Sequence, residues 1–277
     1  MKAYQPESLE ELKAVLAESG PDTALLAGGT DWIIRQRKNG REPAALVYLG
    51  SLPELKLLER QADGLFVGAG CTMAELERSP LLNGPYTVLA EAAAGVGSVQ
   101  IRNRATVGGN IANASPAADT AAPLLCLDAA AQVLRRGEVL EIPVSELITG
   151  SETTVLQPHD VILGFRVPER PADAESHYYK LGFRRQVSIS RFGVAIALRR
   201  EEGVVTEARV AVGAIGPKAV RMPAMEQALL GRRPEEAAAE TGALLADYIR
   251  HTSGRRYKAW ASAGVMEDAL GMFQKKE

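Results

Sequence analysis

Two short segments with adjacent glycines constrain this chain more than any other feature. "LLAGGTD" (25–31) follows a predicted strand and precedes a predicted helix, and "ATVGGN" (105–110) lies between two apolar segments. Because glycine loses more conformational freedom on folding than any other residue, a glycine pair indicates a place where a side chain would block another body. Backbone N–H groups at such bends and at helix N-termini bind anions. The two segments together predict a site that holds one diphosphate from both sides; the alternative is that each is only a tight turn.

Length and charge narrow the class of protein. A chain of 277 residues predicts two or three subdomains, and 32 basic against 34 acidic residues argue against a dedicated nucleic-acid binder. The sequence has no apolar run as long as the ~18 residues of a membrane span, and we expect a cytoplasmic protein without a secretory signal.

The cysteines and histidines argue against a metal site on this chain. Cys71 and Cys126 are far apart, and the three histidines lie near neither each other nor a cysteine. Iron–sulfur clusters usually take four thiolates, and zinc sites need clustered ligands. We therefore predict no metal ligand here.

The order of predicted elements indicates an α+β protein in three parts. We expect a small N-terminal α/β unit over 1–52, a mixed β-rich middle part over 53–169 and a C-terminal sheet with helices over 170–277. The middle part has two strands around an Ala-Asp-Gly turn, a helix with a Thr72–Glu75 capping box, an Ala-rich helix interrupted at Gly95 and Gly97, and a hairpin around Arg136-Gly137. The polar stretch "RPADAES" (170–176) is the predicted linker.

A third glycine segment leaves an alternative open. "FVGAGCTMAEL" (66–76) has Gly68-x-Gly70 between a strand and a helix, as in a dinucleotide-binding fingerprint. Met73 stands where the fingerprint has its third glycine, and its bulk would hinder close packing of helix on strand. An NAD-binding or structural accessory module is the function class that this segment would favour.

Two long motifs carry a family resemblance. "LLAGGTDW" and "IRNRATVGGNIANASPAAD", in this order, resemble the FAD-binding (medium) subunit of molybdenum hydroxylases of the xanthine dehydrogenase and carbon monoxide dehydrogenase type. The resemblance extends over the whole chain and includes "GAGCTMAEL", "DVILGFRVP" and "YKLGFRR". It implies the FAD-binding fold of that family, with the first two parts of the chain around the flavin.

The resemblance also implies which residues bind FAD. One group would surround the diphosphate: Leu26, Ala27, Gly28, Gly29, Thr30, Asp31 and Trp32. A second would form the other diphosphate or ribityl loop: Ala105, Thr106, Val107, Gly108, Gly109 and Asn110. Asp119 would bond toward the ribityl or adenosine portion, Ile162 would lie beside the cofactor, and Lys180 would be a flavin-side lysine. The alternatives are a helix N-cap for Asp119, a core strand residue for Ile162 and a surface position for Lys180.

Two positions depart from some relatives. Ser188-Ile189 replaces an Asp-Tyr pair whose tyrosine covers the flavin ring, so the ring is expected to be more open to a soluble oxidant such as NAD. Val96 replaces an aromatic residue over the cofactor, which puts ring stacking there in doubt.

The resemblance implies an oxidoreductase subunit, a flavoprotein without its own acid, base or nucleophile, because the cofactor carries the redox chemistry. FAD would receive electrons from [2Fe-2S] clusters on a small iron–sulfur subunit, after substrate oxidation on a large molybdopterin-binding subunit, and pass them to NAD or another acceptor. We expect docking surface on the C-terminal helices around Tyr257, Trp260 and Met266; the alternative is that these side chains pack inside their own domain. A stand-alone flavin-dependent oxidoreductase of a related fold is the second function class.

Overall fold

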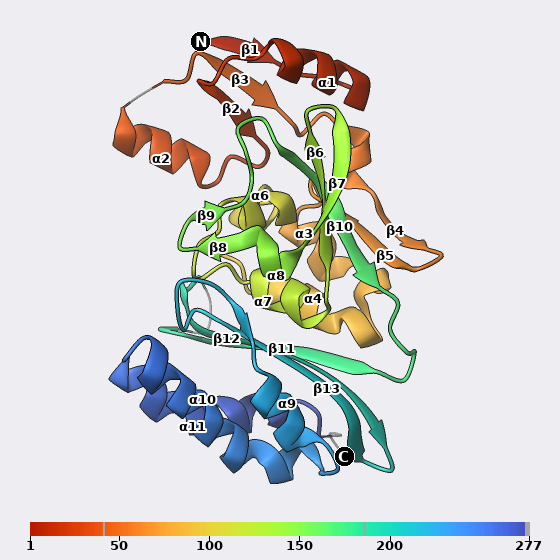
Figure 1. The fold of residues 1–277 in the computed structure, drawn as a ribbon, viewed down its shortest axis with the longest axis vertical. Coiled ribbons are helices and arrows are strands. Elements are labelled where there is room, and N and C mark those ends of the chain that lie inside the picture. The colour runs from red at the N-terminus through yellow and green to blue at the C-terminus, as the bar shows by residue number, and fades with distance from the viewer. Residues whose placement is uncertain (41, 185–186, 275–277) are drawn as a thin grey trace.

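Three sheets stack along the long axis of the molecule (Figure 1). The structure is a computed structural model that describes residues 1–40, 42–184 and 187–274. The N-terminal part lies at one end, the middle part carries most of the short helices, and the C-terminal part ends in a layer of helices. The expected α+β class is confirmed, whereas the residue boundaries of the three parts stay a prediction.

The N-terminal part is a parallel three-stranded sheet in the order β1-β3-β2. Its elements are β1 (Lys2–Tyr4), α1 (Leu9–Glu18), β2 (Thr23–Leu26), α2 (Trp32–Asn39) and β3 (Ala45–Tyr48). Ser8 caps α1 by accepting from the Glu11 N–H at 3.2 Å, and Gly40 ends α2 in the left-handed region at φ 66°. The sequence did not indicate β1, because three residues are too few to display alternation.

The middle part is an antiparallel sheet in the order β4-β5-β10-β6-β7. Its strands are β4 (Leu58–Gln61), β5 (Gly64–Gly68), β6 (Ala130–Arg135), β7 (Glu138–Pro143) and β10 (Val161–Pro168), and a separate small ribbon joins β8 (Ile148–Gly150) to β9 (Thr153–Thr154). Its helices are α3 (Met73–Arg78), α4 (Thr87–Ala94), α5 (Val99–Arg102), α6 (Val107–Ala112), α7 (Ala121–Cys126) and α8 (Val144–Leu147). Short 3-10 turns cover Pro53–Lys56, Pro80–Leu82 and Gly84–Tyr86.

Several local predictions for the middle part are confirmed. Both hairpins form where the turn residues indicate them, and α3 begins with the expected capping box between Thr72 and Glu75. The Ala-rich helix breaks into α4 and α5 at Gly95–Gly97. The segment "ATVGGN", expected as a loop, instead begins α6.

The dinucleotide fingerprint around Gly68 is not supported by the topology. The strand β5 pairs antiparallel with both neighbours, β4 and β10, whereas the fingerprint requires a parallel β-α-β unit. A Cβ on Gly68 would lie 2.3 Å from the Leu55 carbonyl oxygen, and Met73 is fully buried. These glycines therefore serve packing against Leu55.

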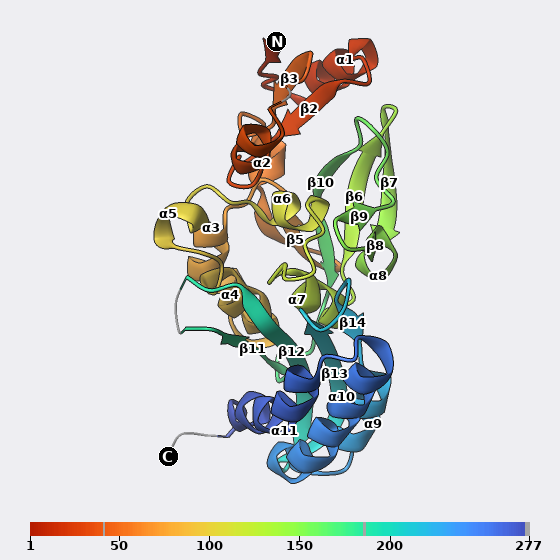
Figure 2. The same ribbon diagram turned by 90° about the vertical axis from the view of Figure 1, so that its left-hand side faces the viewer.

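The C-terminal sheet separates two cores. Its strands are β11 (Glu175–Gly182), β12 (Ser190–Glu201), β13 (Val204–Gly213) and β14 (Val220–Arg221), followed by α9 (Pro223–Leu229), a 3-10 turn (Pro234–Ala237), α10 (Ala238–Thr252) and α11 (Arg256–Gly271). Alternate residues of β12 face opposite sides of the sheet. Ala195 and Ala197 join the core of the middle part, whereas Phe192, Val194, Ile196 and Leu198 pack under helices α9, α10 and α11. Figure 2 shows this sheet between α4 and α7 on one side and α9–α11 on the other.

Candidate functional site

The two glycine segments meet in space. A Cβ on Gly28 would lie 1.9 Å from the carbonyl oxygen of Arg104, so the backbones touch where glycine has no side chain. The Asn113 amide donates to the Asp31 carboxylate at 3.1 Å and ties α6 to the start of α2. Segments about 80 residues apart in sequence thus form one wall, below the end of β2 in Figure 1.

A cavity of about 700 Å³ lies against this wall. Most of the residues that the resemblance assigned to FAD line it: Leu26, Ala27, Gly28, Gly29, Thr30, Asp31, Trp32, Ala105, Thr106, Gly108, Gly109, Asn110 and Ile162. Val107, Asp119 and Lys180 do not line it. Contact of any of these residues with FAD stays a prediction.

The first segment offers free hydrogen-bond donors. After β2 ends at Leu26, the chain turns through Gly29, whose φ of 77° lies in the left-handed region. Within the described part of the chain, the N–H groups of Gly28, Gly29 and Thr30 donate to no acceptor. Helix α2 starts immediately afterwards, and its N-cap Asp31 makes no capping bond with its side chain. Unpaired amides at a helix start bind phosphate oxygens.

The second segment differs from expectation. Its backbone N–H groups already have acceptors inside the chain: Val107 donates to Cys71, Gly108 to Ala69, and Gly109 to the Thr106 hydroxyl at 3.1 Å. The reason is that this segment is the first turn of a helix, held against the loop after β5 by long-range hydrogen bonds. It therefore shapes the cavity and presents few free backbone donors.

The paired glycines of the second segment have different roles. A Cβ on Gly108 would lie 2.5 Å from the Cβ of Ala69 and 2.8 Å from its carbonyl oxygen, so this glycine permits close packing of α6. A Cβ on Gly109 would meet only the Thr106 hydroxyl, at 3.0 Å, and otherwise open space. Gly109 is therefore the position at which a side chain would enter the cavity.

Asn110 supplies a side-chain donor at the cavity. Its Oδ1 accepts from the Thr120 hydroxyl at 2.6 Å, which fixes the orientation of the amide. Among the described residues its Nδ2 has no acceptor. The amide hydrogens are thus available to a ligand oxygen.

Asp119 lies behind the cavity wall in a buried network. Its Oδ1 accepts from Tyr178 at 3.0 Å and from Ser190, and its Oδ2 accepts from Lys180 at 2.8 Å. Burial, reinforced by the Asp119 carboxylate, raises the pKa of Tyr178, so the phenol stays protonated and donates. Thr120, not Asp119, is the N-cap of α7, so the N-cap alternative is wrong.

Lys180 connects this network to the cavity. Its Nζ also donates to the Gly95 carbonyl at 2.8 Å, and the next residues, Val96 and Gly97, line the cavity. The ammonium group thus holds the turn between α4 and α5 in place. The alternative that Lys180 is an ordinary surface lysine is wrong, because its side chain is only 16% exposed.

The rest of the lining includes residues that sequence reasoning missed. Apolar surface comes from Tyr48, Leu55 and Ile101, and charge from Lys56, Glu75 and Arg104. Arg104 and Ile101 stand inside a motif that carried the resemblance, whereas Tyr48 and Leu55 follow no local pattern. Cys71 lies next to the lining, but burial raises its pKa to about 12, so it is a thiol and not a reactive thiolate.

These features suit FAD. Unpaired N–H groups of Gly28–Thr30 match the negative diphosphate, the Asn110 amide matches a ligand oxygen, and the apolar lining matches flat aromatic rings. The donor set on this chain therefore fits the cofactor that the resemblance implies.

Comparisons with known proteins agree along the chain. Residues 1–170 match the FAD binding domain in molybdopterin dehydrogenase, and residues 177–259 match the CO dehydrogenase flavoprotein C-terminal domain. The chain is 30% identical to the xanthine dehydrogenase FAD-binding subunit of Escherichia coli O157:H7, over 92% of this chain and 88% of that one. It is 28% identical to the carbon monoxide dehydrogenase medium chain of Hydrogenophaga pseudoflava, over 95% and 93% of the two chains.

A solved structure of carbon monoxide dehydrogenase from Hydrogenophaga pseudoflava has a chain that superposes with a TM-score of 0.87 at 27% identity, over 98% of this chain and 96% of that one. The fold, the meeting of the two glycine segments and these similarities agree. The chain belongs to the FAD-binding subunits of molybdenum hydroxylases, the family of the xanthine and carbon monoxide dehydrogenase flavoproteins.

Proposed function

We propose that this chain is the electron-transfer subunit of a multi-subunit molybdenum hydroxylase. It would pass electrons from [2Fe-2S] clusters on a small partner chain through FAD to NAD or another acceptor, while a large molybdopterin-binding chain oxidises a substrate of the xanthine or purine type. The observation that carries the proposal is the set of unpaired N–H groups at Gly28–Thr30, facing a cavity closed by a second glycine segment.

The residues of this chain would bind and orient FAD, and bound FAD would supply the redox chemistry. Gly28, Gly29 and Thr30 would donate their amide hydrogens to the diphosphate, and Asn110 would donate from its side chain. Asp119 would act through Lys180, which fixes the turn that ends at the cavity. Apolar side chains such as Ile162, which is 6% exposed, would keep water from the bound ring.

The proposed partners follow from the expectation that this chain binds the flavin while other chains oxidise the substrate and deliver electrons. The chain has the donor set for a flavin, and the relatives named above are subunits of larger enzymes. Within the described residues, no helix has the length and apolarity to cross a membrane. Because these relatives are named as a subunit and a medium chain, the donor of electrons is proposed to be a separate protein that docks on this chain.

NAD is the proposed acceptor because of the loop before β12. Ile189 is 75% exposed and does not line the cavity, which supports a flavin left open on that side. Replacement I189Y is expected to slow reduction of the bound flavin by NADH at least about 10-fold, a barrier of about 1.4 kcal/mol. The matched control is V139Y, at a 55% exposed position on the edge strand β7 outside the cavity.

The test of the function uses the complex purified from its source. We expect FAD on this chain, molybdenum and iron on co-purifying chains, and bleaching of the flavin by NADH in anaerobic stopped flow. A preparation in which this chain alone, free of iron and molybdenum, oxidises a substrate would favour the stand-alone flavin oxidoreductase. A chain that takes up NAD but not FAD would overturn both readings.

A further inference from the structure

A cluster of large side chains stands exposed at one end of the C-terminal sheet. Phe183 is 76%, Tyr257 50% and Trp260 80% exposed. Aromatic side chains that project from a surface without covering a core are typical of protein–protein contacts. Met266, expected in the same docking surface, is fully buried, so that part of the expectation is wrong.

Two regions far apart in sequence build this cluster: residues at the ends of β11 and β12, and the start of α11. The Arg191 guanidinium lies 3.7 Å from the ring centre of Phe183 and 5.0 Å from that of Tyr257. The Tyr257 and Trp260 rings are 6.2 Å apart, centre to centre. In Figure 1 the end of β11 and the turn between α10 and α11 lie on the same side of the molecule. We name Phe183, Arg191, Tyr257 and Trp260 the aromatic–arginine patch.

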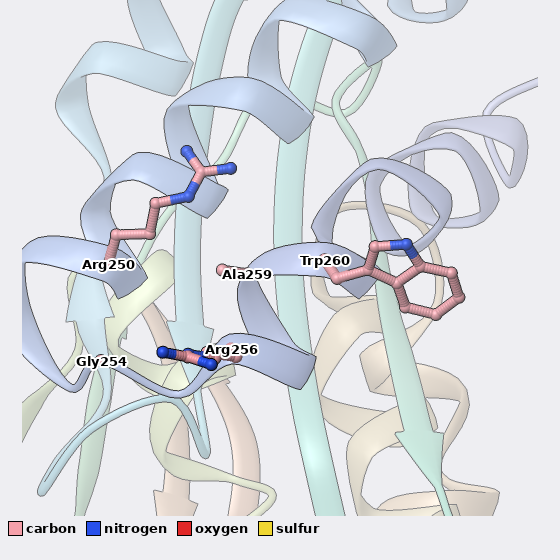
Figure 3. Close-up of a pocket in the computed structure, with 5 residues that line it drawn as sticks. All are labelled: Arg250, Gly254, Arg256, Ala259 and Trp260. Atoms are coloured by element: carbon pink, nitrogen blue, oxygen red, sulfur yellow. The ribbon is translucent and has the colours of Figure 1, made fainter.

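The surroundings of the patch are basic. The described residues of segments 182–191 and 250–260 include six of the chain's 32 Lys and Arg residues and neither Asp nor Glu, although the whole chain is slightly acidic. Figure 3 shows Arg250 and Arg256 on either side of a hollow beside Ala259, with the Trp260 indole directed away from them. A surface of one sign of charge attracts a partner of the opposite sign.

The start of α11 intensifies this charge. Its N-cap is Arg255 without a side-chain capping bond, and its first turn has no acidic residue. Cations at a helix N-terminus are unfavourable because the helix dipole is positive there. Burial, with a smaller contribution from the Arg255 and Arg191 guanidinium groups, lowers the pKa of Lys258 to about 8. Acidic groups from another molecule would offset the positive charge of Arg255 and Arg256 at this helix start.

The patch is linked to the cavity lining through strand β11. Phe183 is three residues after Lys180, whose ammonium holds the Gly95 carbonyl beside the cavity lining. The Ser188 hydroxyl accepts from the Phe183 N–H at 2.8 Å. A protein bound to the patch would therefore contact the end of the strand whose lysine holds the cavity lining.

We propose that the aromatic–arginine patch docks the iron–sulfur chain of the complex, through an acidic surface of that chain with an apolar pocket for Trp260. This inference rests on the proposed function. Clusters held by cysteine thiolates carry negative charge, and an electron donor has to approach the flavin, so the patch's charge and place both fit that chain. The other possible occupants are the molybdopterin chain, a second copy of this chain or a nucleic acid.

The test places a photoreactive benzoylphenylalanine at position 260 of this chain, expressed in the source organism, and purifies the complex before illumination. The matched control places the same residue at position 139, which is 55% exposed on β7. We expect position 260 to cross-link to the iron–sulfur chain, identified by mass spectrometry, and position 139 not to do so. Cross-linking to the molybdopterin chain, to a second copy, to nucleic acid or to nothing in an intact complex would overturn the inference.

Charge reversal gives a second readout. We expect R256E to raise the dissociation constant for the iron–sulfur chain at least about 10-fold at low salt and less at high salt, because rim charges act through screened attraction. The control R136E, on the exposed β6–β7 turn, should leave that constant unchanged. If iron and molybdenum co-purify but these variants behave alike, the inference fails and the proposed function stands; if no iron–sulfur chain co-purifies, the proposed function itself fails.

Discussion

The same substitution to alanine is expected to lower folding stability at Gly108 and to weaken FAD binding at the adjacent Gly109. In G108A the new methyl group would lie 2.5 Å from the Ala69 Cβ and 2.8 Å from the Ala69 carbonyl oxygen. In G109A it would lie 3.0 Å from the Thr106 hydroxyl and otherwise project into the cavity. G108A therefore perturbs the packing of α6, whereas G109A reduces the room for a ligand in the cavity.

The magnitudes follow from these contacts. Overpacking a methyl group against backbone costs about 1–3 kcal/mol, so G108A should lower the free energy of unfolding of the FAD-free chain by that amount. G109A should change it by less than about 1 kcal/mol, because alanine's better helix propensity offsets the close hydroxyl. The same methyl group should cost FAD about 1–3 kcal/mol of binding free energy, which is about a 5- to 150-fold higher Kd.

Two measurements separate the variants. Urea unfolding of the FAD-free proteins reports stability, and titration calorimetry with FAD reports Kd. If G109A binds FAD as tightly as the unsubstituted chain, the assignment of the cavity to the cofactor is wrong. If G108A costs no stability, the close contact between α6 and Ala69 is wrong.

The remaining predictions concern buried ionisable groups. D119N should lower the free energy of unfolding of the FAD-free chain by about 3–5 kcal/mol, because it leaves the buried Lys180 ammonium without its carboxylate partner. The control D173N removes an exposed ion pair with Arg199 and should cost about 0–1 kcal/mol. Urea unfolding of both variants measures the difference. Burial raises the pKa of Cys71 and Cys126 to about 12, so a disulfide reagent at pH 8 should label them only after unfolding, and rapid labelling of the folded chain would contradict this. Burial lowers the pKa of Lys258 from 10.5 to about 8, so between these pH values the unfolded chain binds one more proton than the folded chain and the stability of the folded chain rises with pH. We therefore expect the stability difference between K258M and the unsubstituted chain, measured by urea unfolding, to shrink as the pH rises through this window. A difference that stays constant would refute the shift.

Sequence patterns predicted the elements that depend on local chemistry. The Thr72–Glu75 capping box and the turn at Arg136-Gly137 are local signals, and both features form as expected. The strand β1 and helix α6 depend on distant partners: β1 pairs with β3, and α6 begins by donating to Cys71 and Ala69. Local propensity says little about such contacts, so the sequence gives no sign of β1 and favours a loop where α6 begins.

The location of the candidate site was predictable, whereas its donor pattern was not. Glycine pairs indicated where the backbone comes close to another body, and the structure brings both pairs to one cavity. The sequence did not reveal that Gly28 touches Arg104, that Gly108 packs on Ala69, or that the second segment's amides are already bonded. Each fact depends on a long-range contact, so identical dipeptides have unlike roles.

The residues absent from the cavity lining indicate how such a site is held in shape. Val107 lies one contact behind it, donating to Cys71, and Asp119 lies behind Lys180, which in turn holds the Gly95 carbonyl. Both oxygens of the Asp119 carboxylate accept hydrogen bonds from this chain. Asp119 therefore affects a bound ligand indirectly, because it holds Lys180, which fixes the turn at Gly95–Gly97. Because side chains locked by packing and hydrogen bonds keep a site's geometry, loss of Asp119 would first loosen the cavity wall and only then weaken what binds there.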